Sequence, residues 1–185
     1  VDGKQTYQYH KLEAALKYCK SFRNAVDVGA HIGLWSMHLV KRFQVVYAFE
    51  PVAAHRACFE CNVDGVYSLF KVALGEKAQL VSIHTAPTSS GDSWIDGAGE
   101  IPMWRLDDLK LIDVDFIKLD CEGYELFALR GAENTLREYQ PCVIVEQKPG
   151  RAQRFGLQEI EAVSYLQSLG AKLREELSGD YILSW

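Results

Sequence analysis

No hydrophobic run in this sequence approaches the ~20 consecutive apolar residues that a membrane-spanning helix needs, so no membrane span is predicted. A signal-peptide pattern is not visible either. The chain also lacks a dense stripe of Lys and Arg: 20 basic residues stand against 25 acidic ones, for a net charge of -5. A protein whose main partner is a polyanion such as duplex DNA depends on such a stripe. The composition therefore argues against a nucleic-acid partner.

Cysteine is scarce, with five residues, and its pattern does not provide a metal site. Cys58 and Cys61 form a C-x-x-C pair, but they lie in a predicted helix over residues 52–63 and no second Cys or His pair follows. A structural zinc site takes four ligands, and this pair offers only two. Free thiols are therefore expected. They suit a reducing compartment, so the expected location is cytoplasmic.

The most informative segment that is present is a glycine turn between two apolar runs. Residues 26–28 predict a buried strand, Gly29 and Gly33 a tight turn, and residues 34–42 a helix. Residues 44–49 predict a second strand, which Glu50 follows. A strand-turn-helix-strand unit places an acidic residue against a ribose about 20 positions beyond its turn. The segment therefore predicts a site for a nucleoside-containing cofactor.

The residue at position 31 indicates which cofactor. A dinucleotide-binding turn, G-x-G-x-x-G, uses its middle glycine to let the backbone approach a pyrophosphate, and here His31 takes that place. The carboxylate of Asp27 beside the turn repels a diphosphate and attracts an ammonium group. Both features favour a cofactor without phosphates, such as S-adenosylmethionine. The alternative is a tight turn at Gly29 and Gly33 with Asp27 as a local cap, and Glu50 weighs against it.

The rest of the chain alternates strands with helices and predicts one doubly wound α/β domain over residues 1–185. A helix over residues 10–19, in an N-terminal region 1–24, is expected to pack against the sheet edge. Residues 86–93 are the most loop-like segment, and residues 86–101 are expected to form a substrate-side loop. The other predicted strands cover residues 67–73, 79–85, 115–119, 141–145, 172–173 and 181–183, and the other helices residues 124–139 and 157–169.

Acidic residues end several of the predicted strands. Glu50, Asp120 and Glu146 each follow a strand directly, and Asp27 lies near the end of its own. Ligands of parallel sheets bind at the edge where the carboxyl ends of the strands meet. Like charges concentrated there cost stability unless a ligand, a metal or a proton offsets them. The four acids therefore predict a site at that edge.

Taken together, these segments resemble the FkbM-type S-adenosylmethionine-dependent methyltransferases, which are mostly O-methylating enzymes. The resemblance covers roughly residues 25–148, including Val-Asp-Val-Gly-Ala-His-Ile-Gly at 26–33 and Ala-Phe-Glu-Pro at 48–51. Its most specific part is Ile-Lys-Leu-Asp-Cys-Glu-Gly-Tyr-Glu at 117–125. The other matching pieces are Asn62, Ala73-Leu74-Gly75, Arg105-Leu106-Asp107-Asp108-Leu109, Arg130-Gly131-Ala132 and Val143-Ile144-Val145-Glu146.

The resemblance implies a Rossmann-like class I methyltransferase fold: a mostly parallel seven-stranded sheet, its last strand antiparallel, with helices on both faces. It implies that Asp27 and the two glycines surround the methionine end of the cofactor, and that Glu50 binds the ribose hydroxyls. Asp120 would lie near the sulfonium. Such proteins often carry a histidine after the fifth strand's acid, and Gln147 stands there instead. The candidate cofactor-binding residues are Asp27, Gly29, Ala30, His31, Gly33, Leu34, Glu50, Pro51, Ala73, Leu74 and Asp120.

Methyl transfer to a hydroxyl needs a group that accepts its proton. The candidates are Asp120, Glu122 and Glu146 at the sheet edge and His84 on the loop side. Asp120 and Glu122 could instead cap the helix that begins at residue 124, because carboxylates favour a helix N-terminus. The three acids could also hold a divalent cation, an interpretation that we do not favour.

The expected acceptor is a sugar, a glycan or another small molecule, and S-adenosylhomocysteine is the expected product. Two alternatives stay open: a nucleic-acid methyltransferase, and an NAD-type or non-catalytic nucleotide-binding protein. Amino-methylating base enzymes carry Asn/Asp-Pro-Pro-aromatic after the fourth strand. This chain has Asp-Cys-Glu-Gly at 120–123, which weighs against the first alternative.

Overall fold

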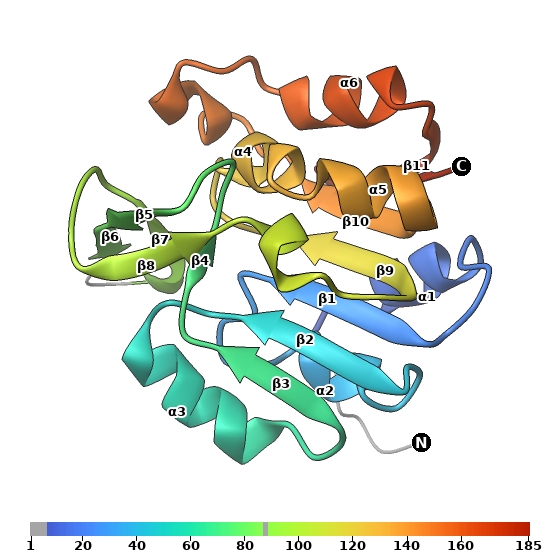
Figure 1. Ribbon diagram of the computed structural model, residues 1–185, viewed down its shortest axis with the longest axis horizontal. Helices are drawn as coiled ribbons and strands as arrows, with labels where there is room; N and C mark the ends of the chain where they lie inside the picture. Colours follow the sequence, from blue (N-terminus) through green and yellow to red (C-terminus); the bar gives the residue numbers. More distant parts are fainter. Residues whose placement is uncertain (1–6, 87–88) are drawn as a thin grey trace.

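A seven-stranded sheet forms the centre of the computed structural model, which describes residues 7–86 and 89–185 (Figure 1). Its strand order is β11-β12-β10-β9-β1-β2-β3. β12 runs antiparallel to both of its neighbours, and the other pairs are parallel. The predicted doubly wound sheet with an antiparallel last strand is confirmed. The strands are β1 (Asn24–Val28), β2 (Val45–Phe49), β3 (Tyr67–Phe70), β9 (Val114–Leu119), β10 (Cys142–Glu146), β11 (Lys172–Leu177) and β12 (Asp180–Ser184).

The three central strands are buried along nearly their whole length. Every residue of β9 and β10 is buried, as is every residue of β1 after Asn24. Parallel strands covered on both faces read as continuous apolar runs, which explains why these segments were recognisable in the sequence. Asp27, Lys118 and Glu146 interrupt these runs with charge. Their burial marks the part of the sheet that the site occupies.

Helices cover both faces of the sheet (Figure 1). On one face, Leu12 and Ala15 of α1 pack with Phe116 and Ile144 of the central strands. The expectation that this helix packs against the sheet edge is therefore wrong, because its apolar side is wide enough to cover the middle of the sheet. The helices are α1 (Tyr9–Leu16), α2 (Ser36–Leu39), α3 (Ala53–Asn62), α4 (Glu125–Arg130), α5 (Glu133–Tyr139) and α6 (Glu161–Ser168), with 3-10 turns η1 (Leu106–Leu109) and η2 (Ala152–Phe155).

The predicted helix over residues 124–139 is two helices, α4 and α5. The chain turns at Gly131, where an added Cβ would lie 2.0 Å from the Gly75 carbonyl oxygen. Asp107 then caps the new helix, because its carboxylate accepts hydrogen bonds from the backbone N–H groups of Asn134 and Thr135, both at 3.0 Å. The helix predicted over residues 34–42 is likewise shorter. In the described residues no helix has the length and apolar character to cross a membrane.

Two small sheets lie beyond the carboxyl ends of the central strands (Figure 1). The predicted strand over 67–73 divides into β3 and β4, and the one over 79–85 into β5 and β6. Most of the predicted loop over 86–93 is strand, since β7 pairs with β6 as a hairpin; residues 87 and 88 lie outside the described residues. The small strands are β4 (Ala73–Leu74), β5 (Gln79–Val81), β6 (Ile83–Ala86), β7 (Ser89–Ile95) and β8 (Ile101–Trp104).

Candidate functional site

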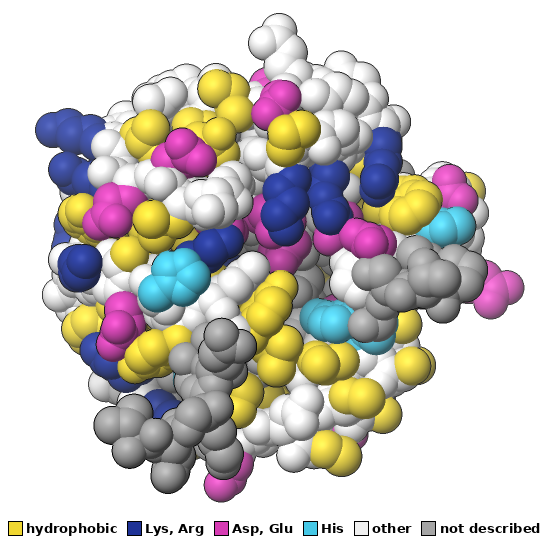
Figure 2. Space-filling view, turned by 180° about the vertical axis from the view of Figure 1, so that it is seen from behind, with side chains coloured by type: hydrophobic (Ala, Val, Ile, Leu, Met, Phe, Trp, Pro, Cys, Tyr) yellow, Lys and Arg dark blue, Asp and Glu magenta, His cyan; other side chains and the backbone are white. Residues whose placement is uncertain are grey.

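A cavity of about 410 Å³ lies at the carboxyl ends of β1, β2, β9 and β10 and reaches the β6–β7 hairpin. On the face shown in Figure 2, acidic side chains lie beside a row of Lys and Arg side chains. Most of the predicted site residues line the cavity: Gly29, Ala30, His31, Leu34, Glu50, Pro51, Ala73, Leu74, Asp120, Glu122 and Glu146.

The glycine turn brings two strands close together at the bottom of the cavity. Gly29 has φ 72°, and a Cβ there would lie 1.9 Å from the Asp120 carbonyl oxygen. Gly33 has φ 86°, and a Cβ there would lie 2.5 Å from the Val63 side chain. Both positions need glycine for conformation and for space. His31 has φ 51°, and its buried Nε2 has no hydrogen-bond partner among the described residues.

Glu50 fixes this turn from the end of β2. One carboxylate oxygen accepts the backbone N–H of His31 at 2.8 Å, and the other accepts that of Val52 at 2.8 Å. His55 Nδ1 lies 3.3 Å from the second oxygen. Glu50 is therefore a buried carboxylate that orders the turn and also faces the cavity.

Asp27 occupies a different place from the one expected for it. It is fully buried and is not among the residues that line the cavity. The register of β1 and β9 sets it beside Lys118. Its Oδ1 lies 3.4 Å from the Lys118 Nζ, and its Oδ2 accepts a hydrogen bond from the Ser36 hydroxyl at 2.7 Å. Its charge therefore acts on the cavity through Lys118.

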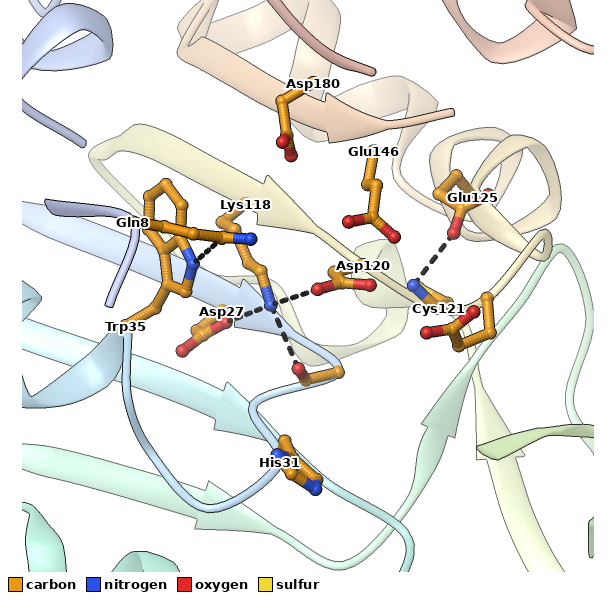
Figure 3. A network of polar contacts seen from close by, with 12 residues as sticks. Gln8, Asp27, His31, Trp35, Lys118, Asp120, Cys121, Glu125, Glu146 and Asp180 are labelled. Atoms are coloured by element: carbon orange, nitrogen blue, oxygen red, sulfur yellow. Dashed lines mark hydrogen bonds and ion pairs between the residues drawn. The ribbon is translucent and has the colours of Figure 1, made fainter. Parts of the chain in front are cut away.

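Asp120 and Glu146 form a carboxyl pair on neighbouring strands. The register of β9 and β10 brings their carboxyl groups side by side, with ligand oxygens within 4.8 Å (Figure 3). Burial raises the pKa of Glu146 to about 7, and the Asp120 charge adds to this effect. Burial alone would raise the pKa of Asp120, but Lys118 and a hydrogen bond with Glu146 hold it below its usual range. A proton shared by the pair therefore resides on Glu146.

Cations surround the acids of this cluster. Lys148 pairs with Glu146, and Arg151 pairs with Glu122 and, at 3.0 Å, with Asp92 of the hairpin. Asp120, Glu122 and Glu146 come close enough together to consider a metal ion. Because protein cations already offset their charges, we assign no metal to them.

The turn that carries Asp120 and Glu122 is held by Glu125. Its Oε1 accepts the backbone N–H groups of Cys121 at 2.8 Å and Gly123 at 3.0 Å, and Gln147 Nε2 donates to its Oε2 at 3.3 Å. Glu125 therefore satisfies the backbone before α4, and not Asp120 or Glu122, whose capping was the alternative to a role in the site. Glu122 is left to face the cavity.

Glu125→Gln is expected to flatten the dependence of stability on pH. Burial raises the pKa of Glu125 to about 7 despite its backbone hydrogen bonds. The folded state therefore binds this proton more tightly than the unfolded chain, so stability is lost as pH rises from about 4.5 to 7, by up to roughly 3 kcal/mol. Urea unfolding between pH 4.5 and 8 measures it. In the Glu125→Gln variant, Glu146 still makes stability fall with rising pH, so the slope should become smaller but not vanish. If Glu125→Gln has the same slope as the Glu159→Gln control, the raised pKa of Glu125 is contradicted.

The loop-side candidate His84 is arranged differently from the expectation. His84 is not among the described residues that line the cavity, and its ring stacks on Trp94 with centroids 3.9 Å apart. Arg154 also lies over the Trp94 ring, at 4.3 Å, so this tryptophan already has polar partners. Four further residues that line the cavity were not predicted from the sequence: Lys118, Lys148, Arg151 and His55. A lysine inside the apolar run of β9 was the signal for the first of them.

Comparison with known proteins supports this picture. The family model described as the methyltransferase FkbM domain matches residues 27–173. Comparison with curated proteins gives no match. The crystal structure of methyltransferase FkbM from Methylobacillus flagellatus KT has 20% sequence identity and a TM-score of 0.62; the match covers 89% of this chain and 44% of that one. This chain thus corresponds to less than half of that protein.

Two further structures share the fold. N-methyltransferase NodS from Bradyrhizobium japonicum WM9 has 10% identity and a TM-score of 0.57, covering 100% of this chain and 97% of that one. A Streptococcus mutans protein solved in complex with S-adenosylhomocysteine has 11% identity and a TM-score of 0.55, covering 98% and 99%. At such identities these structures show the fold alone, whereas the family model spans most of the chain. The chain belongs to the methyltransferase FkbM domain family.

Proposed function

We propose that this protein transfers the methyl group of S-adenosylmethionine to a hydroxyl oxygen of a sugar, a glycan or another small molecule. The observation that carries the proposal is one cavity that joins the glycine turn and Glu50 to the Asp120–Glu146 carboxyl pair. The family supports methyl transfer. The S. mutans structure bound to S-adenosylhomocysteine supports this cofactor for the fold.

The cavity residues fit S-adenosylmethionine. Gly29 lines the cavity and lets the backbone at the end of β1 approach that of Asp120, and Glu50 retains acceptor capacity for ribose hydroxyls. Ala73 and Leu74 offer an apolar wall for the adenine. The unpartnered His31 Nε2 is a further polar atom that a ligand can satisfy. When bound, the cofactor supplies an electrophilic methyl group on a sulfonium.

Glu146 is the proton acceptor in this proposal. An alkyl hydroxyl is a weak nucleophile at neutral pH, so a base must take its proton as the new bond forms. A general base works best when its pKa is near the working pH, and that of Glu146 is raised to about 7. Asp120 remains an anion at the same end of the cavity and aligns the reacting groups by its charge.

The choice of an oxygen acceptor rests on this carboxyl pair and on the family resemblance. The fold does not decide it, since an N-methyltransferase shares the fold. Glu122, Arg151 and Asp92 border the cavity on the side of the hairpin and offer paired charges to an acceptor's hydroxyl groups. A methyl-transfer screen with isotope-labelled cofactor over sugars, glycans, amines and RNA tests the acceptor. Labelling of amines or RNA alone would contradict the proposal.

S-adenosylmethionine and S-adenosylhomocysteine are expected to raise the melting temperature, whereas NAD is expected to leave it unchanged. A ligand present at about 100 times its dissociation constant stabilises the folded state by roughly 2.7 kcal/mol. His31 occupies the position where a dinucleotide's pyrophosphate needs glycine, which explains the discrimination. Thermal-shift titration with each ligand measures it. Stabilisation by NAD and none by the methyl donor would overturn the cofactor assignment.

A further inference from the structure

Lys118 is a buried lysine that touches both the glycine turn and the carboxyl pair. Its side chain is 6% exposed. Its Nζ donates to the Gly29 carbonyl oxygen at 3.0 Å and lies 3.4 Å from Asp27 and 3.6 Å from Asp120 (Figure 3). One ammonium group therefore connects the ends of β1 and β9 on the side where the cavity opens.

The two carboxylates around Lys118 differ in their exposure and in their contacts. Asp27 is fully buried and anchored by the Ser36 hydroxyl, so it is a fixed counter-ion beneath the lysine. The side chain of Asp120 is 27% exposed and faces the cavity. Burial alone would lower the pKa of Lys118, but Asp27 and Asp120 together keep it above its ordinary value. The lysine therefore stays charged and attracts Asp120 from the protein side.

Many charged and titratable groups interact with Asp120, so the role of Lys118 has to be separated from theirs. The Lys118 charge lowers the pKa of Asp120 more than the charges of Lys148 and Arg151 do. A hydrogen bond with Glu146 also lowers the pKa of Asp120, and the Asp120 charge in turn raises the pKa of Glu146. The charged and titratable groups that interact with Asp120 are His31, Lys118, Cys121, Glu122, Glu125, Glu146, Lys148, Arg151 and Asp180, and Asp27 lies behind them against Lys118.

We propose that Lys118 is a positioning residue: its buried ammonium group, set against Asp27, holds Asp120 as an anion that faces the cavity and leaves the shared proton on Glu146. The charges of Lys118 and Asp120 are thereby in place before any substrate binds. The lysine acts on the reaction through Asp120. This role rests on the proposed methyl transfer, whereas the charge arrangement itself can be measured without it.

Substitutions at Lys118 and Asp27 are expected to act in opposite directions. Lys118→Met removes the positive charge, so the pKa of Asp120 should rise by about 1–3 units, as expected for the loss of an opposite charge at this range. Asp27→Asn removes a negative charge and leaves the lysine, so the pKa of Asp120 should fall. If Lys118 and Asp27 had only a packing role, their substitution would not shift the pKa of Asp120 in these opposite directions.

Carboxyl NMR of the protein, labelled with ¹³C at Asp and Glu carboxyl carbons, measures both pKa values as pH is varied, with Asp120→Asn and Glu146→Gln to assign the signals. In the Lys118→Met variant the Asp120 signal should titrate at higher pH than in the unchanged protein, and in Asp27→Asn at lower pH. Exposed Lys41→Met is the matched control and should leave both signals unchanged.

The pH dependence of turnover, with an accepted substrate, gives a second readout. The rise of turnover with pH reports the loss of the proton from the carboxyl pair. This rise should move to higher pH in Lys118→Met, which loses a positive charge, and to lower pH in Asp27→Asn, which loses a negative one. If Lys118→Met does not fold, the downward shift in Asp27→Asn still decides the matter. Unchanged Asp120 and Glu146 titrations would overturn the proposal. The absence of methyl transfer to any acceptor, with the titrations moving as expected, would instead overturn the proposed function.

Discussion

Glu146→Gln is expected to lower the turnover number by on the order of a hundredfold or more while leaving cofactor affinity nearly unchanged. The substitution keeps the shape of the side chain and removes the group that accepts the proton, an effect typically of this size. In the unchanged protein, turnover should rise with pH through about 7, because Glu146 must lose its own proton before it can act as a base. The variant should lack that rise.

Asp120→Asn is the comparison that tells the two acids apart. It removes the anion that the proposed mechanism uses to align the reacting groups, so turnover should also fall by on the order of a hundredfold. Removing the Asp120 charge lowers the pKa of Glu146, so the rise in turnover should move to lower pH rather than vanish. Turnover with saturating substrates between pH 5 and 9 measures both variants, with exposed Glu159→Gln as the control. Near-normal turnover in both would mean that alignment and water exclusion carry the rate.

Glu50→Ala is expected to weaken the binding of S-adenosylmethionine by roughly 10–100-fold. Hydrogen bonds to a charged group contribute about 1.5–3 kcal/mol each, and 1.4 kcal/mol is a factor of ten in affinity. The same carboxylate accepts the backbone N–H groups of His31 and Val52. A loss of about 1–3 kcal/mol in the free energy of unfolding is therefore expected as well.

Isothermal titration well below the melting temperature separates the two effects of Glu50→Ala, and exposed Glu60→Ala supplies a matched loss of one negative charge. Lower stability with unchanged affinity would show that Glu50 only orders the turn. Lower affinity with an intact fold supports ribose binding.

The sequence by itself determined the architecture and the location of the candidate site at the carboxyl ends of the strands. Buried parallel strands such as β9 and β10 are covered on both faces, so their apolar runs are visible without a structure. A tight turn requires glycines at 29 and 33, and Glu50 at the end of β2 accepts a hydrogen bond from that turn. These residues lie close together in the sequence, so their pattern can be recognised without a structure.

Only the tertiary structure determines the different surroundings of the acids. Asp27, Asp120 and Glu146 are alike in sequence, each at or near a strand end. Strand register pairs Asp27 with Lys118 beneath the cavity and sets Asp120 against Glu146 inside it. Likewise, Gly131 between α4 and α5 packs against Gly75, and Asp107 caps α5; both partners are distant in sequence. The burial of an acid and its protonation depend on neighbours from other strands. The distances to those neighbours cannot be read from the order of residues in the sequence.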